Sequence, residues 1–363
     1  MEKHWRGVIC ILTILWLIFL YYDVTQLNHT GRPKPKPISP HCKHQENEKL
    51  ANITNKCNNF DNLKKVLLLI NYNFPHYATI PVLKKLYSGL FADIVFCGDS
   101  DHPEVIKIDG TKGYLGYACV AKAIRLFPDL SGYLYINDDV ILNWWNIIGL
   151  DTSKIWTGKE IDFRTGHKFG ESTLPSWHWW HVLNTAYLCE VALEQTLKLC
   201  QSTEGKRLNL TNLHRTYYRN TNGSKICLKA RSDVVYIPQE YAEAYAKISD
   251  INSSNNVFLE VAVPGILAFF WTPFNSYNLN GSYFNDIYGY STKYYSGEAF
   301  YETYTFDLTF SHPFKLGGQR KAANWNFLKN VVMQYGKNLK QFCLREKTYV
   351  KHLDRSECKS VSK

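Results

Sequence analysis

The feature that most constrains the fold is an alternation of short apolar runs with segments of helical periodicity. Apolar runs of strand length occupy residues 65–71 (KVLLLIN), 92–97 (ADIVFC) and 132–136 (GYLYI). Between them, residues 81–90 and 116–127 repeat apolar side chains at helical spacing. A continuous apolar run is typical of a strand that is buried on both faces of a parallel sheet. The order therefore predicts an α/β domain with a doubly wound, mostly parallel sheet.

Later segments extend this pattern. Residues 233–238 (DVVYIP) predict another strand, residues 239–248 predict a helix, and residues 257–271 form an apolar segment interrupted by Glu260 and Pro264. The interrupted segment is too short and too broken to span a bilayer. With 363 residues and 45% hydrophobic content, the chain can build a substantial core, and its composition argues against disorder, collagen-like repetition and coiled coil. Length alone is compatible with one domain and a tail or with two domains.

The first 63 residues predict a membrane tether. Residues 1–7 contain a lysine and an arginine. Residues 8–22 contain no charged residue, and the next charge along the chain is that of Asp23. This segment ends in bulky residues that include two tyrosines, whereas a cleaved signal peptide, the alternative, ends in small residues. We therefore predict a cytoplasmic tail at 1–7, an uncleaved transmembrane signal-anchor at 8–22 and a luminal stem at 23–63, which is type II topology.

Two further patterns bear on a luminal location. Asn-x-Ser/Thr sequons beyond the anchor predict glycosylation at Asn28, Asn52, Asn209, Asn222, Asn252 and Asn280. The ten cysteines include no CxxC pair, which argues against zinc ribbons and thioredoxin chemistry, and the odd number beyond the anchor leaves at least one thiol without an intrachain partner. Spacing does not determine the disulfide pairing, and we take Cys42–Cys57 and Cys343–Cys358 as working hypotheses.

The net charge of +10 suits an anionic ligand, a nucleic acid or an acidic surface. No arginine-rich run and no known nucleic-acid motif accompanies this charge, so we predict no nucleic-acid partner. Charge alone selects no other partner.

Two adjacent acids follow the predicted strand at 132–136, which ends in Asn137-Asp138-Asp139. Open α/β sheets bind ligands at the carboxyl ends of their strands. Carboxylates there suit a hard divalent cation such as Mg²⁺ or Mn²⁺, which would bridge the protein and a diphosphate. The alternative is that the two acids form a solvated turn or cap the next helix.

The anchor and stem, the strand–helix–strand order and the sequence GYLYINDDVILNWWN together resemble the Golgi glycosyltransferases of the GT-A fold, whose Asp-x-Asp motif ends a strand. Here Asn137 takes the first place of that motif, so the metal would be held by two carboxylates, by one, or through water. The segments VFLEVAVP and HPFK are also similar to the STELLO-like group of glycosyltransferases. The resemblance covers roughly residues 64–320.

The resemblance implies a GT-A-like domain at 64–337, followed by a basic tail at 338–363. It implies a metal-dependent transfer of a sugar from a nucleotide-sugar donor, a nucleoside diphosphate derivative, to a glycan or glycoprotein in the lumen of the Golgi or ER. The cofactor would be Mn²⁺ or Mg²⁺. A catalytically silent GT-A-like scaffold or glycan-binding protein is the alternative, and the sequence does not decide donor, acceptor or stereochemistry.

Carried over position by position, the resemblance assigns the metal to Asp138, Asp139 and His312. A structural or surface role is the alternative for His312. The nucleotide base and ribose would lie near Asn71, Tyr72 and Asp99, where ordinary turn chemistry is the alternative. Candidates for contact with the diphosphate are Lys315, Lys122 and Arg125.

An inverting transfer needs a carboxylate base near the acceptor hydroxyl. Glu260 is the first candidate because burial in its apolar segment would raise its pKa, and Asp233 is the second. The alternative for Glu260 is an ion pair with a nearby arginine or lysine. The aromatic residues Trp177, Trp179 and Trp180 are candidates for stacking on the acceptor sugar, with core packing as the alternative.

Overall fold

The computed structural model describes residues 57, 61–108, 113–169, 171, 177–181, 184–289, 298–317 and 321–345. The predicted anchor at 8–22 lies outside these residues, as does the predicted stem except for Cys57 and residues 61–63. Within the described ranges, no helix combines the length and apolarity needed to cross a membrane. The described elements belong to a single compact unit that spans residues 54–363.

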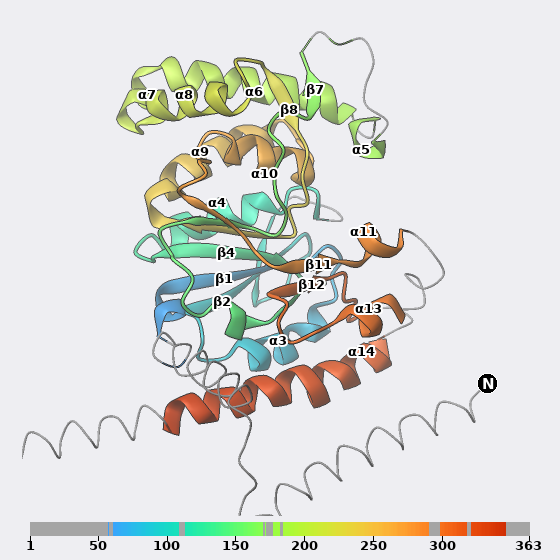
Figure 1. Ribbon diagram of the computed structural model, residues 1–363. Helices are drawn as coiled ribbons and strands as arrows, with labels where there is room; N and C mark the ends of the chain where they lie inside the picture. The colour runs from blue at the N-terminus through green and yellow to red at the C-terminus, as the bar shows by residue number, and fades with distance from the viewer. Residues whose placement is uncertain are drawn as a thin grey trace, which may run out of the picture. The chain divides into compact units, whose positions relative to one another are not determined.

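A seven-stranded sheet forms the centre of the domain, with the strand order β10-β6-β9-β4-β1-β2-β3 (Figure 1). Strand β1 runs parallel to β2 and β4, and β9 runs antiparallel to both β4 and β6. The prediction of an α/β fold with a mostly parallel sheet is confirmed, and β9 is the exception to the common direction. In chain order, the strands are β1 Val66–Asn71, β2 Asp93–Gly98, β3 Val105–Lys107, β4 Gly132–Asn137, β6 Ile155–Thr157, β9 Val234–Pro238 and β10 Ser276–Asn278.

Helices cover both faces of the sheet (Figure 1). On one face lie α4 (Tyr117–Leu126), α9 (Gln239–Ser254) and α10 (Leu259–Leu267), and on the other lies α3 (Ile80–Tyr87). Every residue of β1 and β4 is buried, which explains the continuous apolar runs in the sequence. Single turns of 3₁₀ helix flank these elements at Asn62–Lys65, Tyr77–Thr79 and Trp144–Asn146.

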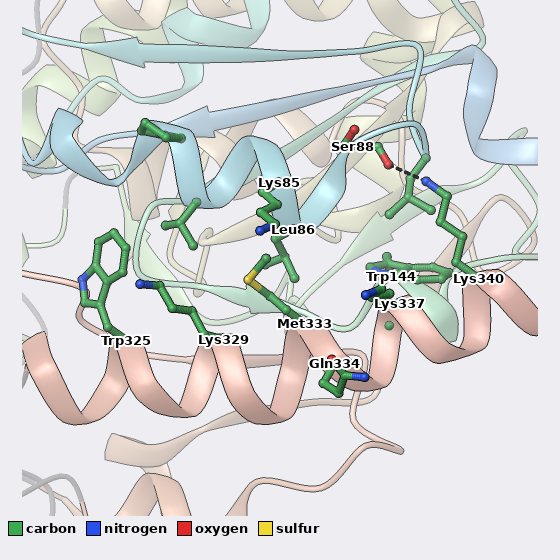
Figure 2. Close-up of a pocket in the computed structure, with 14 residues that line it drawn as sticks. Lys85, Leu86, Ser88, Trp144, Trp325, Lys329, Met333, Gln334, Lys337 and Lys340 are labelled. Atoms are coloured by element: carbon green, nitrogen blue, oxygen red, sulfur yellow. Dashed lines mark hydrogen bonds between the residues drawn. The ribbon is translucent and has the colours of Figure 1, made fainter.

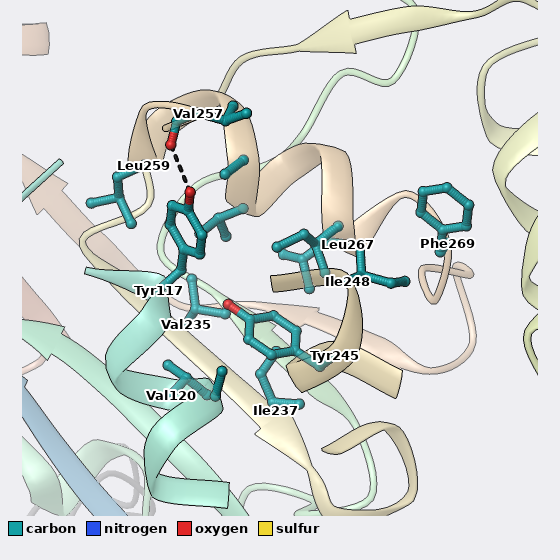
Figure 3. Close-up of a cluster of buried hydrophobic side chains, with 14 of the residues drawn as sticks. Tyr117, Val120, Val235, Ile237, Tyr245, Ile248, Val257, Leu259, Leu267 and Phe269 are labelled. Carbon is teal, nitrogen blue, oxygen red and sulfur yellow. Dashed lines mark hydrogen bonds between the residues drawn. The ribbon is translucent and has the colours of Figure 1, made fainter. Parts of the chain in front are cut away.

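The packing of α4, α9 and α10 fixes the start of α10 (Figure 3). The Tyr117 hydroxyl donates to the Val257 carbonyl at 2.8 Å, and Leu259, Val235 and Tyr245 are buried in the same cluster. Within the apolar segment at 257–271, residues 259–267 therefore form a core helix, with Pro264 inside it.

A further layer packs outside α9 and α10 (Figure 1). It contains the helices α6 (Thr185–Gln201), α7 (Thr203–Arg207) and α8 (Leu210–Asn220), together with the antiparallel pair β7 (Gly166–Lys168) and β8 (Ile226–Leu228). A second small sheet has the order β11-β12-β5, formed by β11 Gly281–Tyr283, β12 Phe310–His312 and β5 Ile141–Leu142. The remaining short helices are α5 His178–His181, α11 Phe284–Tyr288 and α13 Glu298–Thr303.

The last described helix begins as α14 (Lys321–Phe327), passes through a π-helical turn at Leu328–Val332 and continues to residue 345. It packs beside α3 and extends past residue 338, the predicted start of the basic tail. Figure 1 shows it along the face of the domain opposite α9.

Three disulfides link the described residues: Cys57–Cys343, Cys97–Cys119 and Cys189–Cys227. The hypotheses Cys42–Cys57 and Cys343–Cys358 were wrong, because Cys57 and Cys343 pair with each other across 286 positions of sequence. Cys343 lies in the last helix, so this bond joins that helix to the first described residue of the chain. In the described part of the chain, Cys200 is a buried free thiol.

Candidate metal centre and active site

Three strand ends bring two carboxylates and an imidazole together. Asp139 follows β4 by two residues and Asp233 precedes β9 by one, and the antiparallel pairing of these strands places both acids at one edge of the sheet. The third residue, His312, ends β12, whose partner strand β5 begins two residues after Asp139. One potential ligand atom from each residue lies within 4.8 Å of the others.

The cluster is buried and holds its charges close together. His312 Nε2 lies 3.3 Å from Asp139 Oδ1 and 3.2 Å from Asp233 Oδ1. Lys315 Nζ contacts the other oxygen of Asp139, Oδ2. Asp139 is 2% exposed and Asp233 is 7% exposed, so these ionic contacts are largely shielded from water.

The neighbouring charges shift the pKa values of the cluster in opposite directions. Burial alone would raise the pKa of Asp139, but His312 and Lys315 outweigh burial and hold that pKa well below its usual range. Burial alone would lower the pKa of His312, but the carboxylates of Asp233 and Asp139 raise it above its usual range. Two carboxylates therefore favour a positive charge at the centre of the cluster.

The atoms of the cluster fit a divalent cation. Among the described residues, the buried atoms Asp233 Oδ2 and His312 Nδ1 have no hydrogen-bond partner. Such atoms are rare in folded proteins and often indicate an ion or water. Two carboxylates neutralise a doubly charged ion, and carboxylate oxygens suit Mg²⁺ and Mn²⁺, while the imidazole favours Mn²⁺ over Mg²⁺. Asp139, Asp233 and His312 are therefore the residues that could hold a metal.

This set differs from the predicted one by a single residue. We expected Asp138 to bind the metal, but Asp138 is not part of the cluster, and its Oδ1 accepts a hydrogen bond from the Asn73 backbone N–H at 3.1 Å. Burial and the charge of Asp139 raise the pKa of Asp138 to about 7. Asp233, which we expected as a second candidate base, joins Asp139 and His312 instead.

Asn137 explains the departure from an Asp-x-Asp motif. Its side-chain amide donates to Asp233 Oδ1 at 2.8 Å, and its side-chain oxygen accepts from the Tyr135 hydroxyl at 2.7 Å. An aspartate at this position would lose the donor and place a third carboxylate against Asp233. The amide thus orients one acid of the cluster without adding negative charge.

Glu260 lies in the first turn of α10. It has both the ion pair and the raised pKa that we considered for it from the sequence. Its Oε1 lies 3.4 Å from Arg231 Nη1, which is the ion pair that we considered as an alternative role. Nevertheless, burial and the charge of Asp233 raise the pKa of Glu260 to about 7. Arg231, which we did not predict, also pairs with Asp286 at 3.0 Å, and Lys159 pairs with Asp286 at 2.9 Å. No sequence motif pointed to Arg231, because its partners lie 29 and 55 residues away.

The predicted nucleotide-binding residues lie at the same sheet edge but differ in exposure. Asn71 and Tyr72 are at most 2% exposed, and the Tyr72 hydroxyl bonds Thr79 Oγ1 at 2.7 Å, so both side chains face the interior. Asp99 is half-buried and accepts from the Ser100 hydroxyl at 2.9 Å.

Of the three predicted diphosphate contacts, Lys315 is the one that touches the cluster. Lys122 donates to the Lys107 carbonyl at 2.6 Å, and Arg125 pairs with Asp250. Both are exposed on α4, and the contacts of their side chains lead away from the metal cluster.

The predicted acceptor-binding tryptophans, Trp177, Trp179 and Trp180, differ in burial. Trp180 is fully buried, as in the core-packing alternative, and packs edge-on against Trp177 at 5.5 Å. Trp179 is half-buried and stacks on Phe258, with ring centroids 4.5 Å apart. Because Phe258 precedes Glu260 by two residues, the stacked pair lies beside the turn that carries the candidate base.

The sequons also differ in exposure. Asn209, Asn222 and Asn280 are exposed, whereas Asn252 is 7% exposed and donates from its side chain to the Ile248 carbonyl within α9. A glycan on Asn252 would require the helix to open, so we do not retain it as an acceptor site. Asn28 and Asn52 lie outside the described residues.

Comparison with known proteins confirms the resemblance to the STELLO-like group. No protein-family model matches the chain. "Probable glycosyltransferase STELLO2" of Arabidopsis thaliana is 19% identical over 244 residues, which are 66% of this chain and 29% of that protein. "Probable glycosyltransferase STELLO1" of the same plant is 22% identical over 217 residues, which are 59% of this chain and 25% of that protein. The chain thus matches less than a third of the length of each relative, and it is a distant relative of these two plant proteins.

Proposed function

We propose that this protein is a metal-dependent glycosyltransferase that moves a sugar from a nucleotide-diphosphate donor to a hydroxyl of a glycan or glycoprotein. The observation that carries the proposal is the buried cluster of Asp139, Asp233 and His312 at the ligand-binding edge of a mostly parallel sheet. The distant relationship to two proteins named as probable glycosyltransferases supports the reaction class.

Each residue near the cluster has a defined role in this proposal. Asp139, Asp233 and His312 would hold Mn²⁺ or Mg²⁺, which when bound supplies positive charge against the diphosphate leaving group. Lys315 lies beside Asp139 and its side chain is 51% exposed, so it can reach phosphate oxygens on the solvent side of the cluster. An ammonium group there would stabilise the same developing charge.

Glu260 is the group proposed to take the proton of the acceptor hydroxyl if the transfer inverts the anomeric centre. A general base works best when its pKa lies near the working pH, and the pKa of Glu260 is raised to about 7. Arg231 holds one carboxylate oxygen of Glu260 and thereby orients the other. The stacked rings of Trp179 and Phe258 beside this turn offer an apolar surface for the face of an acceptor sugar.

We further propose that the domain works in the lumen of the Golgi or ER, attached by the apolar segment at 8–22. The apolar segment and the sequons support this placement. Three disulfides among the described residues also support it, since disulfides form and persist in oxidising compartments.

A donor panel tests the proposed reaction. The purified full-length protein would be incubated with individual nucleotide-sugars and Mn²⁺, Mg²⁺ or EDTA, and release of the nucleotide would be measured. We expect release from at least one donor that depends on metal and is lost in Asp233→Asn. Failure of every donor to bind or react, with metal bound at the cluster, would favour the catalytically silent alternative.

A further inference from the structure

A groove that the proposed reaction does not use lies between α3 and the last helix. Its volume is about 710 Å³, and none of the three cluster residues lines it. Figure 2 shows side chains of the two helices facing each other across it. The apolar part of its lining includes Val82, Leu86, Trp144, Trp325 and Met333.

Lysine side chains surround this apolar floor. Lys85, Lys329, Lys337 and Lys340 line the groove, and no carboxylate is among its lining residues. Lys85, Lys329 and Lys337 are exposed, whereas Lys340 is half-buried and donates to the Ser88 carbonyl at 2.9 Å (Figure 2). The ammonium group of Lys329 lies 5.0 Å from the centre of the Trp325 ring. Lys337 and Lys340 are neighbours on the last helix beside this apolar surface, an arrangement that favours a ligand with an anionic group next to an apolar part.

The volume of the groove is that of a small-molecule site. Pockets for single small molecules have volumes of about 300–1,000 Å³. The groove, with about 710 Å³, is large enough for one amphipathic small molecule.

We propose that this groove binds a lipid that has one apolar chain and a phosphate head group. The chain would lie on Leu86, Met333 and Trp325, where its burial removes apolar surface from water. The phosphate would lie at the end of the groove where Lys337 and Lys340 follow Met333 on the last helix (Figure 2), because lysine binds phosphate as a mobile point charge. This binding does not depend on the glycosyltransferase proposal.

Photo-crosslinking of the full-length protein tests this site. A lysophosphatidate with a photoreactive acyl chain would be added below its critical micelle concentration, and labelled peptides would be located by mass spectrometry. We expect labels within residues 81–90 and 325–340, and competition by unlabelled lysophosphatidate. Labels confined to other segments would overturn the proposal.

Competition by two smaller molecules tests whether both the phosphate and the acyl chain are needed for binding. Neither inorganic phosphate nor a monoacylglycerol with the same chain should compete at concentrations at which lysophosphatidate does. If phosphate competes equally well, the groove binds free anions, and if the monoacylglycerol does, the lysines are irrelevant. Either result would contradict the proposed ligand.

Variants separate the contributions of charge and apolar floor. The double variant Lys337→Gln, Lys340→Gln should reduce labelling at least about tenfold, because it removes two charge-assisted contacts. Met333→Asp should abolish labelling, because it places a carboxylate on the floor. A matched double variant, Lys154→Gln with Lys168→Gln, changes two lysines outside the groove and should leave labelling unchanged.

Thermal melting should be unaffected in the two lysine double variants, and Mn²⁺ binding should be unaffected in all three variants, which distinguishes loss of the ligand from loss of the fold. Met333→Asp should lower the melting temperature, because Met333 is half-buried against the core. Lysine-directed crosslinks would reveal other occupants of the groove. Links from Lys329 or Lys337 to residues 23–56, or to a second copy of the chain, would overturn the lipid proposal.

Discussion

Replacing Asp233 with asparagine is the most direct test of the metal centre. Asp233 contributes one of the two carboxylates of the cluster, and its Oδ2 has no hydrogen-bond partner among the described residues. The substitution keeps the size of the side chain but removes its charge. Loss of a residue that merely supports a metal ligand costs about 10–100-fold in affinity. Loss of a ligand should therefore weaken Mn²⁺ binding by at least about 100-fold, or about 2.7 kcal/mol.

Asp233→Asn is a cleaner test than the equivalent change at Asp139. Both acids are buried and pair with His312, but Asp139 also pairs with Lys315, and breaking a buried ion pair destabilises proteins by about 3–5 kcal/mol. A loss of metal binding in Asp139→Asn would thus be hard to distinguish from a loss of the fold.

Titration of the purified full-length protein with Mn²⁺ provides the assay, because electron paramagnetic resonance detects free Mn²⁺ directly. Asp286→Asn is the matched control: Asp286 pairs with Arg231 and Lys159 but is not part of the metal cluster. We expect the control to bind Mn²⁺ within about threefold of the unchanged protein, well below the effect of losing a ligand. Equal affinity of Asp233→Asn and the unchanged protein would refute the assignment of the cluster as a metal site.

Three other substitutions test separate parts of the structure. Glu260→Gln should lower the rate of sugar transfer by about 10²–10⁴. Burial raises the pKa of Glu260 also when a bound cation offsets the charge of Asp233, so the rate of the unchanged enzyme should rise with pH as Glu260 loses its proton, and a pH profile of Glu260→Gln that keeps this rise would contradict its role as base. The double variant Cys57→Ser, Cys343→Ser frees a loop of 286 positions and should lower the free energy of unfolding by about 5–6 kcal/mol, so a loss below about 1 kcal/mol in urea denaturation would show that the crosslink contributes little. Asn137→Asp replaces the donor that lies 2.8 Å from Asp233 and should destabilise the metal-free protein by about 1–3 kcal/mol, and unchanged thermal and urea denaturation would argue against the orienting role.

The raised pKa of Glu260 also predicts how stability depends on pH. The folded state favours the protonated carboxyl, so the contribution of Glu260 is complete below about pH 4.5 and is lost as pH rises to about 7. The loss is at most about 3 kcal/mol. Urea denaturation of the metal-free protein at several pH values should show this slope, and Glu260→Gln should flatten it. An equal slope in both proteins would mean that other groups cause it.

The strands and helices around β1 were predictable because each is specified locally. A parallel strand buried on both faces needs a continuous apolar run, and residues 66–71 and 132–137 provide one. The direction of β9 was not predictable in this way, since antiparallel pairing with β4 depends on the path of the 96 intervening residues. Asp233 was consequently expected near the site without its role as a potential metal ligand.

Contacts between distant segments explain the other differences. Cys57 and Cys343 carry no mutual signal in the sequence, because their approach depends on where the last helix packs. In the sequence, Asn137 is only a departure from the Asp-x-Asp motif. Its role depends on the hydrogen bond that its amide donates to Asp233, which the sequence does not predict. His312 and Asp139, by contrast, were predicted together, although only through the resemblance to GT-A enzymes and not from their spacing of 173 positions.

The Cys57–Cys343 disulfide also has a mechanical consequence. If the chain is tethered through its first residues, any pull along them reaches Cys57 before it reaches β1 at Val66. The covalent bond to Cys343 passes part of that force to the last helix, which packs beside α3. The hydrogen bonds of the central sheet would then bear less of the force. A membrane-bound form could therefore be pulled through its first residues without separation of the strands.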